Sequence, residues 1–462
     1  MITTKSLENT YTTLPAIFYT PHTPMPNPNS HVVLYNEVLA DMLDLDLDSA
    51  ILSDTVCPDG AMPIAQAYAG YQFGHFSMLG DGRATLLGEH IAPNGTRYDI
   101  QLKGAGATQY ARGGDGLAAL APMLREYIIS EFMAAMGIPT TRSLAVVATG
   151  APVYRQKQLQ GAVLTRIASS HIRIGTFNFA EAYGTLSDLR ALADYTISRH
   201  FQHLETSANP YLGLLREVAS RQAELVAKWM LVGFVHGVMN TDNAAISGET
   251  IDYGPCAFLD VFDPATVFSS IDTHGRYSYQ NQPKIAAWNL CRLAESLLPL
   301  ISTNDDEAAT LANGEIKQYH HSYNNHWLNG MRGKMGLTNS YPHDAALAQE
   351  LLDIMSTHKM DYTTTFQNFD QPQLTSWRSK WHDRLAQGKQ TPEDARDIMN
   401  RHNPATIPRN HHVEHALAAA ESGDMQPVRN LIAALNDPYT PSEYTHSSQQ
   451  TGTEKYVTFC GT

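Results

Sequence analysis

The segment HGVMNTDNAAISGETIDYGP, residues 236–255, contains side chains suited to phosphate chemistry. Asn243 and Asp252 offer the hard oxygen ligands that Mg²⁺ prefers, and this ion usually takes only a few ligands from protein. Asp242 would then be free to accept a proton from an attacking hydroxyl group. The alternative is that Asp-Asn and Asp-Tyr-Gly form ordinary turns, in which Asp, Asn and Gly are common.

The spacing within this segment differs from that of a protein kinase. A kinase has a His-Arg-Asp motif, an Asn five residues after that Asp, and a later Asp-Phe-Gly. When Asn243 is placed at the kinase Asn, Val238 falls where the kinase has its proton acceptor. The sequence therefore indicates either an inactive site or one in which Asp242 takes over that role. We expect His236 to order the loop from the core and not to act as a base.

A lysine and a glutamate earlier in the chain could help to hold phosphate. Lys103 ends the strand-like run DIQLKG, and a lysine at a strand end is a common ligand of ATP phosphates. Glu126 lies on a mostly apolar face of an expected helix, residues 117–137, which Gly137 would end. A carboxylate buried there is costly unless it is paired, and Lys103 is the candidate partner. The alternatives are a solvated lysine beside a turn and a glutamate at an exposed rim.

Two glycine-rich segments offer further groups for an anion. In the sequence GDGR, Gly80 and Gly82 would let backbone N–H groups approach phosphate oxygens, while Arg83 adds positive charge. Asp115 and Gly116 open the expected helix, so Asp115 is a candidate N-cap and the backbone there could meet an anion or a ribose. Glycine-rich turns and N-caps are common, so a purely structural role is the alternative for each segment.

Two arginines lie seven residues apart in LTRIASSHIRIGTF, a polar and β-branched stretch. If Arg166 and Arg173 point to a common centre, they could clamp a phosphate group between their guanidinium groups. The alternative is that both form ordinary salt bridges at the surface.

The pattern along the chain predicts how these residues are positioned. Residues 1–60 are expected to form an arm with a short helix in VVLYNEVLADMLDLD, and residues 61–160 a β-rich lobe. Residues 161–340 are mostly helical in pattern, and residues 341–462 form a polar, helical extension. The sequence thus predicts an α+β protein with a cleft between a β-rich lobe and a helical lobe.

Two local signals are the clearest of all. Asn94-Gly95 is typical of a tight hairpin turn, and it joins the strand-like runs ATLLGEH and TRYDIQLK. The run LGLLREVASRQAELVAKWMLVGFVHG predicts a helix over residues 212–237. The apolar face of that helix would carry Leu225, Trp229, Val232 and His236.

The composition limits the choice of partners and of compartment. The net charge of −14 and the isoelectric point near 5.7 disfavour nucleic acid and anionic membranes as main partners. The start of the chain has neither a basic nor an apolar signal region, and no apolar run approaches the ~20 residues of a membrane span. Four scattered cysteines indicate neither a disulfide framework nor a metal site. We expect a cytoplasmic protein.

A set of long motifs runs from about residue 65 to residue 417. They are YAGYQFGHF, LGDGRA, DIQLKGAGATQYARGGDGLAAL, LREYIISEFM, LTRIASSHIRIGTF, HGVMNTDN, DYGP with FLD following, HGRYSYQNQP and NPATIPRNHHVEHAL. In these motifs the chain resembles the selenoprotein O family (SelO, also called YdiU). Members of this family have a protein-kinase-like fold but transfer AMP, with ATP bound in a flipped orientation. The resemblance implies a two-lobed, kinase-like fold with N- and C-terminal extensions.

The resemblance also implies a role for each candidate residue. Asp242 would be the proton acceptor, while Asn243 and Asp252 would bind Mg²⁺, for which Mn²⁺ could substitute. Lys103 would bind phosphate and pair with Glu126. The other nucleotide contacts would be Gly80, Gly82, Arg83, Asp115, Gly116 and Asp252, with Arg166 and Arg173 on the distal phosphates.

The C-terminal tail departs from that of some relatives. Relatives carry selenocysteine or cysteine near this end, and here the tail YVTFCGT has Cys460. In some relatives the tail cysteine pairs with one downstream of the DYG motif, where this chain has Phe268, Ser269 and Ser270. Cys256 follows DYGP directly, so a regulatory Cys256–Cys460 disulfide and an unpaired tail thiol both stay open.

We therefore predict a monomeric protein adenylyltransferase that uses ATP and Mg²⁺ and has a link to redox stress. It would modify Ser, Thr or Tyr hydroxyl groups of other proteins and release pyrophosphate. One alternative is a kinase that transfers a phosphoryl group from the same site. The other is a non-catalytic ATP-binding scaffold whose tail cysteine senses redox state.

Overall fold

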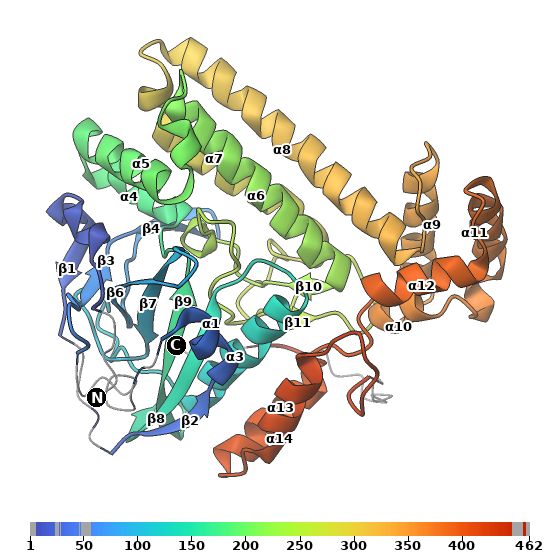
Figure 1. Ribbon diagram of the computed structural model, residues 1–462, viewed down its shortest axis with the longest axis horizontal. Helices are drawn as coiled ribbons and strands as arrows, with labels where there is room; N and C mark the ends of the chain where they lie inside the picture. Colours follow the sequence, from blue (N-terminus) through green and yellow to red (C-terminus); the bar gives the residue numbers. More distant parts are fainter. Residues whose placement is uncertain are drawn as a thin grey trace.

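The computed structural model describes residues 6–23, 27, 29–45, 47, 57–445 and 456–458. Within these residues the chain is a mixed α+β protein, as predicted: a seven-stranded sheet occupies one part, and a long series of helices follows it (Figure 1). None of the helices that the structure describes is both long enough and apolar enough to cross a membrane.

The sheet supplies the framework around the candidate site. Its strands follow the order β1-β3-β6-β7-β9-β8-β2, and each neighbouring pair is antiparallel. The predicted hairpin is confirmed, because β6 and β7 pair across a turn in which Gly95 has a φ of 81°. The strands are β1 (Tyr19–Pro21), β2 (His31–Tyr35), β3 (Ile64–Gln66), β6 (Ala84–Ile91), β7 (Arg97–Lys103), β8 (Arg142–Tyr154) and β9 (Gln158–Ala168).

The N-terminal arm is part of this sheet, since β1 and β2 form its two edges. The helix expected in VVLYNEVLADMLDLD is only partly correct: VVLY belongs to β2, and helix α1 covers Glu37–Leu43. The side chain of Asn36 caps α1 by accepting a hydrogen bond of 3.1 Å from the backbone N–H of Leu39. Strand pairing with β8 thus overrides the helical pattern in the first half of this stretch.

Side chains alternate between the two faces of β7, as the two-residue period of a strand requires. Ile100 and Leu102 are buried in a core cluster on one face, where residues of α1 also pack. Gln101 and Lys103 belong to the opposite face and are buried as well. Arg166 of β9 lies directly opposite Gln101 in the register. The strand pairing therefore gathers polar and charged groups on the face away from α1.

Helix α3, Leu120–Ala135, packs against β8 and β9. Its predicted end is confirmed, because Gly137 follows the C-cap with a φ of 66°. Its predicted start is wrong: the N-cap is Ala119 and not Asp115. Ala119 forms a bridge with Gly161 of β9, so the chain before the helix is an extended loop that follows the sheet.

The helical part begins after β9. In Figure 1 the helices α6, α7 and α8 lie side by side, and each of the three contacts the other two. Helix α4 connects this group to the sheet-containing part by packing against α7 and strand β4. The bounds are β4 (Ala69–Gln72), α4 (Ile174–Tyr183), α5 (Leu186–His200), α6 (Pro210–Val232), α7 (Gln282–Ile301) and α8 (Asp305–Lys334).

The helix predicted over residues 212–237 ends at Val232, because Gly233 takes a left-handed conformation with a φ of 72°. His236 therefore lies outside the helix, contrary to the prediction, and follows the short strand β10 (Phe234–Val235). Its expected role in the core is confirmed. The ring is fully buried, and its Nε2 lies 2.9 Å from the carbonyl oxygen of Ile251.

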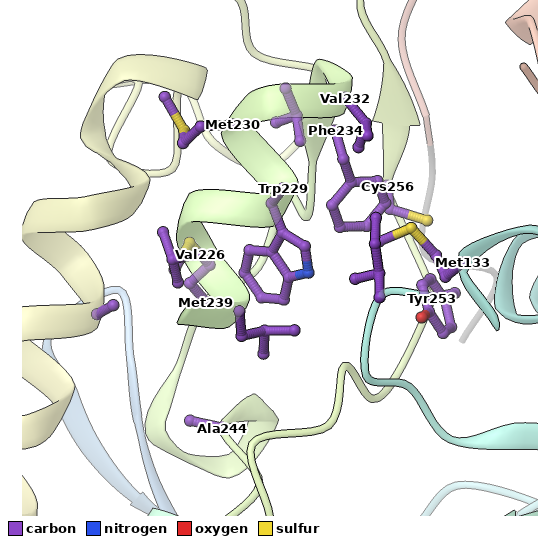
Figure 2. Packing of buried hydrophobic residues seen from close by; sticks show 14 of the residues in the cluster. Met133, Val226, Trp229, Met230, Val232, Phe234, Met239, Ala244, Tyr253 and Cys256 are labelled. Carbon is purple, nitrogen blue, oxygen red and sulfur yellow. The ribbon is translucent and has the colours of Figure 1, made fainter. Parts of the chain in front are cut away.

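Buried aromatic and sulfur-containing side chains form a cluster around the end of α6 and the strand β10 (Figure 2). The ring of Phe234 lies 5.5 Å from that of Trp229 on α6 and 6.1 Å from that of Tyr253. β10 also pairs with β11, Ala257–Phe258. The cluster therefore attaches two loops to the end of α6. One is the loop before Asp242, and the other is the loop after Asp252.

The C-terminal helices first lead away from the sheet and then return to it. Figure 1 shows α9 to α12 beyond the end of α8, whereas α13 and α14 pack on α3. Arg125 on α3 pairs with Glu414 on α13 and donates a hydrogen bond of 3.2 Å to the hydroxyl group of Tyr456. The bounds are α9 (Asp344–Thr357), α10 (Tyr362–Gln367), α11 (Thr375–Gln387), α12 (Pro392–His402), α13 (Asn410–Glu421) and α14 (Gln426–Leu435).

Candidate active site

A cavity of about 300 Å³ opens at the ends of β6, β7 and β9 and at the loop between α6 and β11. It brings together every predicted site residue except Glu126, which lies directly behind Lys103. The lining includes Gly80, Gly82, Arg83, Lys103, Asp115, Gly116, Arg166, Arg173, Asp242, Asn243 and Asp252.

Lys103, Glu126 and Arg166 form a buried ion network at the base of this cavity. Lys103 Nζ lies 2.7 Å from Glu126 Oε2, and Arg166 Nη2 lies 2.5 Å from Glu126 Oε1. Burial alone would raise the pKa of Glu126, but Arg166 and Lys103 together bring that pKa below its ordinary value. The predicted pairing of Lys103 with Glu126 is present, and the solvent-exposed alternatives for both residues are wrong.

Asp252 is the point at which three cationic side chains meet. Its Oδ1 lies 2.7 Å from both Lys103 Nζ and Arg166 Nη2, and its Oδ2 lies 2.8 Å from Arg173 Nη1. Burial acts to raise the pKa of Asp252, but Lys103, Arg166 and Arg173 lower it well below the ordinary value. The two arginines are buried and converge on one carboxylate, so the surface salt bridges considered for them are wrong.

The backbone around Asp252 directs its side chain toward the cavity. Asp252 has a φ of 63°, in the left-handed region that few non-glycine residues adopt. Its neighbour Tyr253 is buried in the opposite direction, where its hydroxyl group forms a hydrogen bond with Thr140. The packing of Tyr253 against Phe234 stabilises this unusual conformation, because it ties the residue after Asp252 to the core.

Asp242 lies in a short 3-10 turn, Thr241–Asn243, and its backbone carbonyl oxygen accepts a hydrogen bond of 2.7 Å from Arg173 Nη1, the nitrogen that also pairs with Asp252. Its Oδ1 is buried and has no hydrogen-bond partner among the described residues. Burial raises the pKa of Asp242 to about 6, and Arg173 opposes this increase. A carboxylate with an unpaired oxygen and a raised pKa is suited to accept a proton near neutral pH.

Asn243, next to Asp242, is oriented by the loop in which it lies. Its side-chain N–H donates a hydrogen bond of 2.9 Å to the carbonyl oxygen of Val238. This bond uses the amide nitrogen and leaves Oδ1 as an acceptor. The side-chain N–H of Asn289 on α7 donates to the carbonyl oxygen of Met239 at 3.0 Å, which holds the same loop from the helical side.

The glycines of GDGR allow two loops to pack closely against each other. Gly80 has a φ of 99°, and a Cβ atom there would lie 2.4 Å from the ring of Tyr110. A Cβ atom on Gly82 would lie 2.8 Å from the carbonyl oxygen of Tyr110. Gly116 is equally tight, since its Cβ would lie 2.2 Å from the backbone of Gly106. These two loops together form one wall of the cavity.

Asp115 is placed at the rim of the cavity and not at a helix N-terminus. Its carboxylate is bound by Arg155, with distances of 2.7 Å and 3.0 Å to the two guanidinium nitrogens. It also accepts a hydrogen bond of 3.0 Å from the backbone N–H of Leu117. The hydrogen bonds from Arg155 hold the pKa of Asp115 below its ordinary value. A helix dipole therefore does not add to the binding of an anion at Asp115 and Gly116.

The lining residues that the sequence analysis did not single out include Tyr68, Tyr110, Arg112 and Arg155. Tyr68 lies against the guanidinium group of Arg173, whose carbon is 4.5 Å from the ring centre. Arg112 is exposed and has a φ of 50°. Tyr110 and Arg112 stand within GATQYARGGDG, so the signal for them was an aromatic and a basic residue inside a glycine-rich loop.

The predicted tail cysteine, Cys460, lies outside the described residues. The tail residues just before it run beside the segment that follows DYGP. Thr458 donates its backbone N–H to the carbonyl oxygen of Phe268 at 2.8 Å, and Ser270 donates to the carbonyl oxygen of Thr458 at 3.0 Å. The hydroxyl group of Thr458 donates to the carbonyl oxygen of Pro255 at 2.7 Å. The tail thus reaches the loop that carries Asp252.

Comparison with known proteins places this site in a family. A family model described as "Protein adenylyltransferase SelO" matches residues 1–373 of the chain. A "Protein nucleotidyltransferase YdiU" of Brevibacillus brevis is 53% identical over 479 residues, which cover 99% of this chain and 98% of the relative. The proteins of the same name from Halalkalibacterium halodurans and Geobacillus kaustophilus are 53% and 52% identical. They match 99% and 98% of this chain and 98% and 99% of the relatives, respectively.

Proposed function

The chain belongs to the SelO family of protein adenylyltransferases, and we propose that it transfers AMP from ATP to hydroxyl side chains of other proteins. The acceptors would be Ser, Thr or Tyr, and pyrophosphate would be released. One observation carries this proposal beyond family membership. Three cations converge on Asp252 at the base of the cavity, whereas the carboxylate of Asp242 forms no ion pair among the described residues and its Oδ1 has no hydrogen-bond partner there.

Each group has a task in this reaction. The acceptor oxygen attacks the α-phosphorus of ATP, and the bond from that phosphorus to the oxygen bridging the α- and β-phosphates breaks. Asp242 takes the proton of the acceptor hydroxyl group. Lys103, Arg166 and Arg173 stabilise the negative charge that develops on pyrophosphate, as positive groups fixed in advance do in a site shielded from water. This assignment requires ATP in the flipped orientation, with its distal phosphates at the three cations.

The remaining residues would hold the nucleotide. Glu126 keeps Lys103 and Arg166 in place through its two ion pairs. The wall formed by Gly80, Gly82 and Arg83 and the rim at Asp115 and Gly116 would contact the nucleotide. Arg112, exposed on the same wall, adds a positive charge that can meet the α-phosphate or the acceptor.

The residues present fit a Mg²⁺ ion held together with ATP. The amide nitrogen of Asn243 donates to Val238, which leaves Oδ1 as the atom that could bind the ion, and Asp252 offers carboxylate oxygens in the same cavity. The described residues contain no cluster of three or more His, Cys, Asp or Glu side chains arranged for a metal. Phosphate oxygens and water would therefore complete the ligand shell, as Mg²⁺ prefers. When bound, the ion would neutralise phosphate charge.

We propose a kinase-like fold of two lobes for the domain organisation. The β-rich lobe would cover residues 61–160 and the helical lobe residues 161–340, with residues 1–60 and 341–462 as extensions. The strand-to-helix pair of Lys103 and Glu126 supports this assignment, because kinases connect their β-rich lobe to a helix by the same pair. β9 continues to Ala168, which moves the proposed boundary between the lobes to the end of that strand.

The net charge of −14 supports a protein that binds neither nucleic acid nor anionic membranes. We propose that it acts as a monomer in the cytoplasm on ATP and on protein substrates.

Labelled ATP separates adenylyl transfer from phosphoryl transfer. With ATP labelled at the α-phosphate, we expect label to enter protein, and with ATP labelled at the γ-phosphate we expect none. Label from the γ-phosphate alone would establish the kinase alternative. ATP binding without any transfer from either position would establish the non-catalytic scaffold.

Gly70→Ala is expected to impair the proton acceptor specifically. A Cβ atom on Gly70 would lie 2.0 Å from Asp242 Oδ1, so the carboxylate must move. A displacement of about 1 Å can lower a rate about 10²-fold, and we expect a loss of that order in AMP transfer with ATP affinity unchanged. Gly314→Ala on α8 is the control, because a Cβ atom there meets no atom within 4 Å. Full activity of Gly70→Ala would remove Asp242 from the proposed role.

A further inference from the structure

A second hollow lies beside the active site, next to the hairpin of β4 and β5 (His75–Met78). We call it the hairpin groove, and it has a volume of about 460 Å³. Its apolar side is formed by Phe73, Ile271 and Ile285, and its polar side includes His274, Arg276 and Lys284. Ile271 is 58% exposed, so the groove presents apolar surface to solvent next to basic groups.

The hairpin joins this groove to the proposed proton acceptor. At its base, Gly70 lies against Asp242, and the backbone N–H of Tyr71 donates to the hydroxyl group of Thr241 at 3.1 Å. At its tip, the backbone N–H of Phe73 donates to Oδ1 of Asn240 at 3.3 Å. The same β-hairpin therefore borders both the catalytic turn and the groove.

The positive charge of the groove is not neutralised within the part of the chain that the structure describes, where no ion pair involves Arg276 or Lys284. The guanidinium carbon of Arg276 lies 4.8 Å from the ring centre of Trp288, a contact that orients the group without removing its charge. The carboxylate that lines the groove, Asp272, is buried and accepts the backbone N–H groups of Arg276 and Tyr277 at 2.9 Å and 2.8 Å.

Arg276 and Lys284 thus form a local basic site on a chain in which 46 acidic residues outnumber 32 basic ones. A ligand that carries negative charge would be attracted to the groove and repelled by most of the remaining surface. The apolar wall beside Arg276 would accept a hydrophobic side chain of the same ligand. An extended, acidic polypeptide segment has both properties.

We propose that the hairpin groove binds the protein substrate as an extended segment with an acidic residue three or four positions from the acceptor hydroxyl group. The spacing follows from the hairpin. Gly70 meets Asp242, and an ideal Cβ on Gly74 would lie 3.7 Å from the guanidinium carbon of Arg276. β4 is extended only to Gln72, and Phe73 and Gly74 form the turn of the hairpin, with φ values of 51° and 89°. From Gly70 to this turn the chain therefore covers roughly 10 Å, about three residue steps at ~3.3 Å each, and a peptide beside the strand advances by the same rise. The acidic residue then lies at Arg276 when the hydroxyl group lies at Asp242.

This inference rests on the proposed function, and a peptide library tests the two separately. The library contains a central Ser, Thr or Tyr with either Asp or Lys at positions three and four on each side, and it is incubated with ATP labelled at the α-phosphate. We expect the wild-type protein to label the Asp peptides of one side about tenfold faster than the Lys peptides. Arg276→Glu is expected to reverse this preference and to leave ATP affinity unchanged, because Arg276 lies outside the nucleotide cavity.

Arg396→Glu is the matched control, since Arg396 is an exposed arginine on α12, far along the chain from the hairpin. It changes the net charge by the same amount and is expected to keep the preference for Asp. Equal labelling of Asp and Lys peptides would overturn the groove assignment, and so would an unchanged preference in Arg276→Glu. Label on intact proteins but on no peptide would also overturn it. Absence of α-label from every protein and peptide would instead overturn the proposed function.

Discussion

Replacing Asp242 by asparagine is expected to lower the rate of AMP transfer by about 10²–10⁴-fold, the usual contribution of a positioned proton acceptor. The amide has nearly the shape of the carboxylate but cannot take the proton of the acceptor hydroxyl group. ATP should still bind, because Lys103, Arg166 and Arg173 are unchanged. The measurements are transfer of α-labelled AMP at saturating ATP and ATP affinity by titration.

The same substitution is expected to make the protein without nucleotide and metal more stable at pH 7, by about 3 kcal/mol. Burial raises the pKa of Asp242 to about 6, so its ionised form favours the unfolded state, in which its pKa is ordinary. This cost is complete above pH 6, decreases as the carboxyl group protonates in the folded protein, and vanishes below the ordinary value of about 4. The gain in thermal stability of Asp242→Asn should therefore disappear between pH 6 and pH 4.

Asp383→Asn, at an exposed position on α11, is the control for the loss of one negative charge. It should change neither activity nor the dependence of stability on pH. An Asp242→Asn protein that transfers AMP at the wild-type rate would contradict the assignment of the proton acceptor. A loss of stability at pH 7 would contradict the view that this carboxylate is held in an unfavourable environment.

Asp252→Asn is expected to abolish AMP transfer and to change stability in the opposite direction. Lys103, Arg166 and Arg173 all pair with this carboxylate. Without it Lys103 and Arg166 share Glu126 alone, and the nearest carboxylate to Arg173 is that of Asp81 at 3.7 Å, so buried positive charge is left in excess. Breaking a buried ion network in this way costs about 3–5 kcal/mol. Thermal unfolding without nucleotide should therefore occur at a lower temperature than in the wild type.

The dependence on pH follows from the lowered pKa of Asp252. Its contribution to stability is fully present above the ordinary value of about 4 and is lost as the pH falls toward the folded-state pKa. The wild type and Asp252→Asn should thus become similar in stability only in strong acid. ATP and Mg²⁺ should raise the unfolding temperature of the wild type more than that of the variant. Equal stability of the two proteins at pH 7 would contradict the network described for this site.

Local signals in the sequence were sufficient for several parts of this arrangement. Asn94-Gly95 predicted the hairpin, because this residue pair is typical of tight turns, and Gly137 predicted the end of α3. The apolar neighbours of Glu126 made burial one of two alternatives, beside an exposed rim, and a buried carboxylate needs a cation such as Lys103.

Other parts depend on contacts between distant segments and could not be predicted in this way. VVLY forms a strand because β8, more than a hundred residues later, offers it an edge. Arg166 meets Glu126 because β9 pairs with β7 in one particular register. Asp115 faces Arg155 instead of capping α3, because the chain before the helix follows the sheet. The early end of α6 at Gly233 was visible in the sequence, but the apolar pattern continued past it.

The return of the C-terminal segment to α3 determines when the site can be completed during synthesis. Arg125 is separated from Glu414 by 289 residues and from Tyr456 by 331. At roughly 5–20 residues per second, a ribosome needs about 15–60 s to add that length of chain. During this time α3, the helix that carries Glu126, has been synthesised, but its contacts with Glu414 and Tyr456 cannot yet form. The growing chain can form its sheet early, but α3 gains these contacts only after Glu414 and Tyr456 have been added.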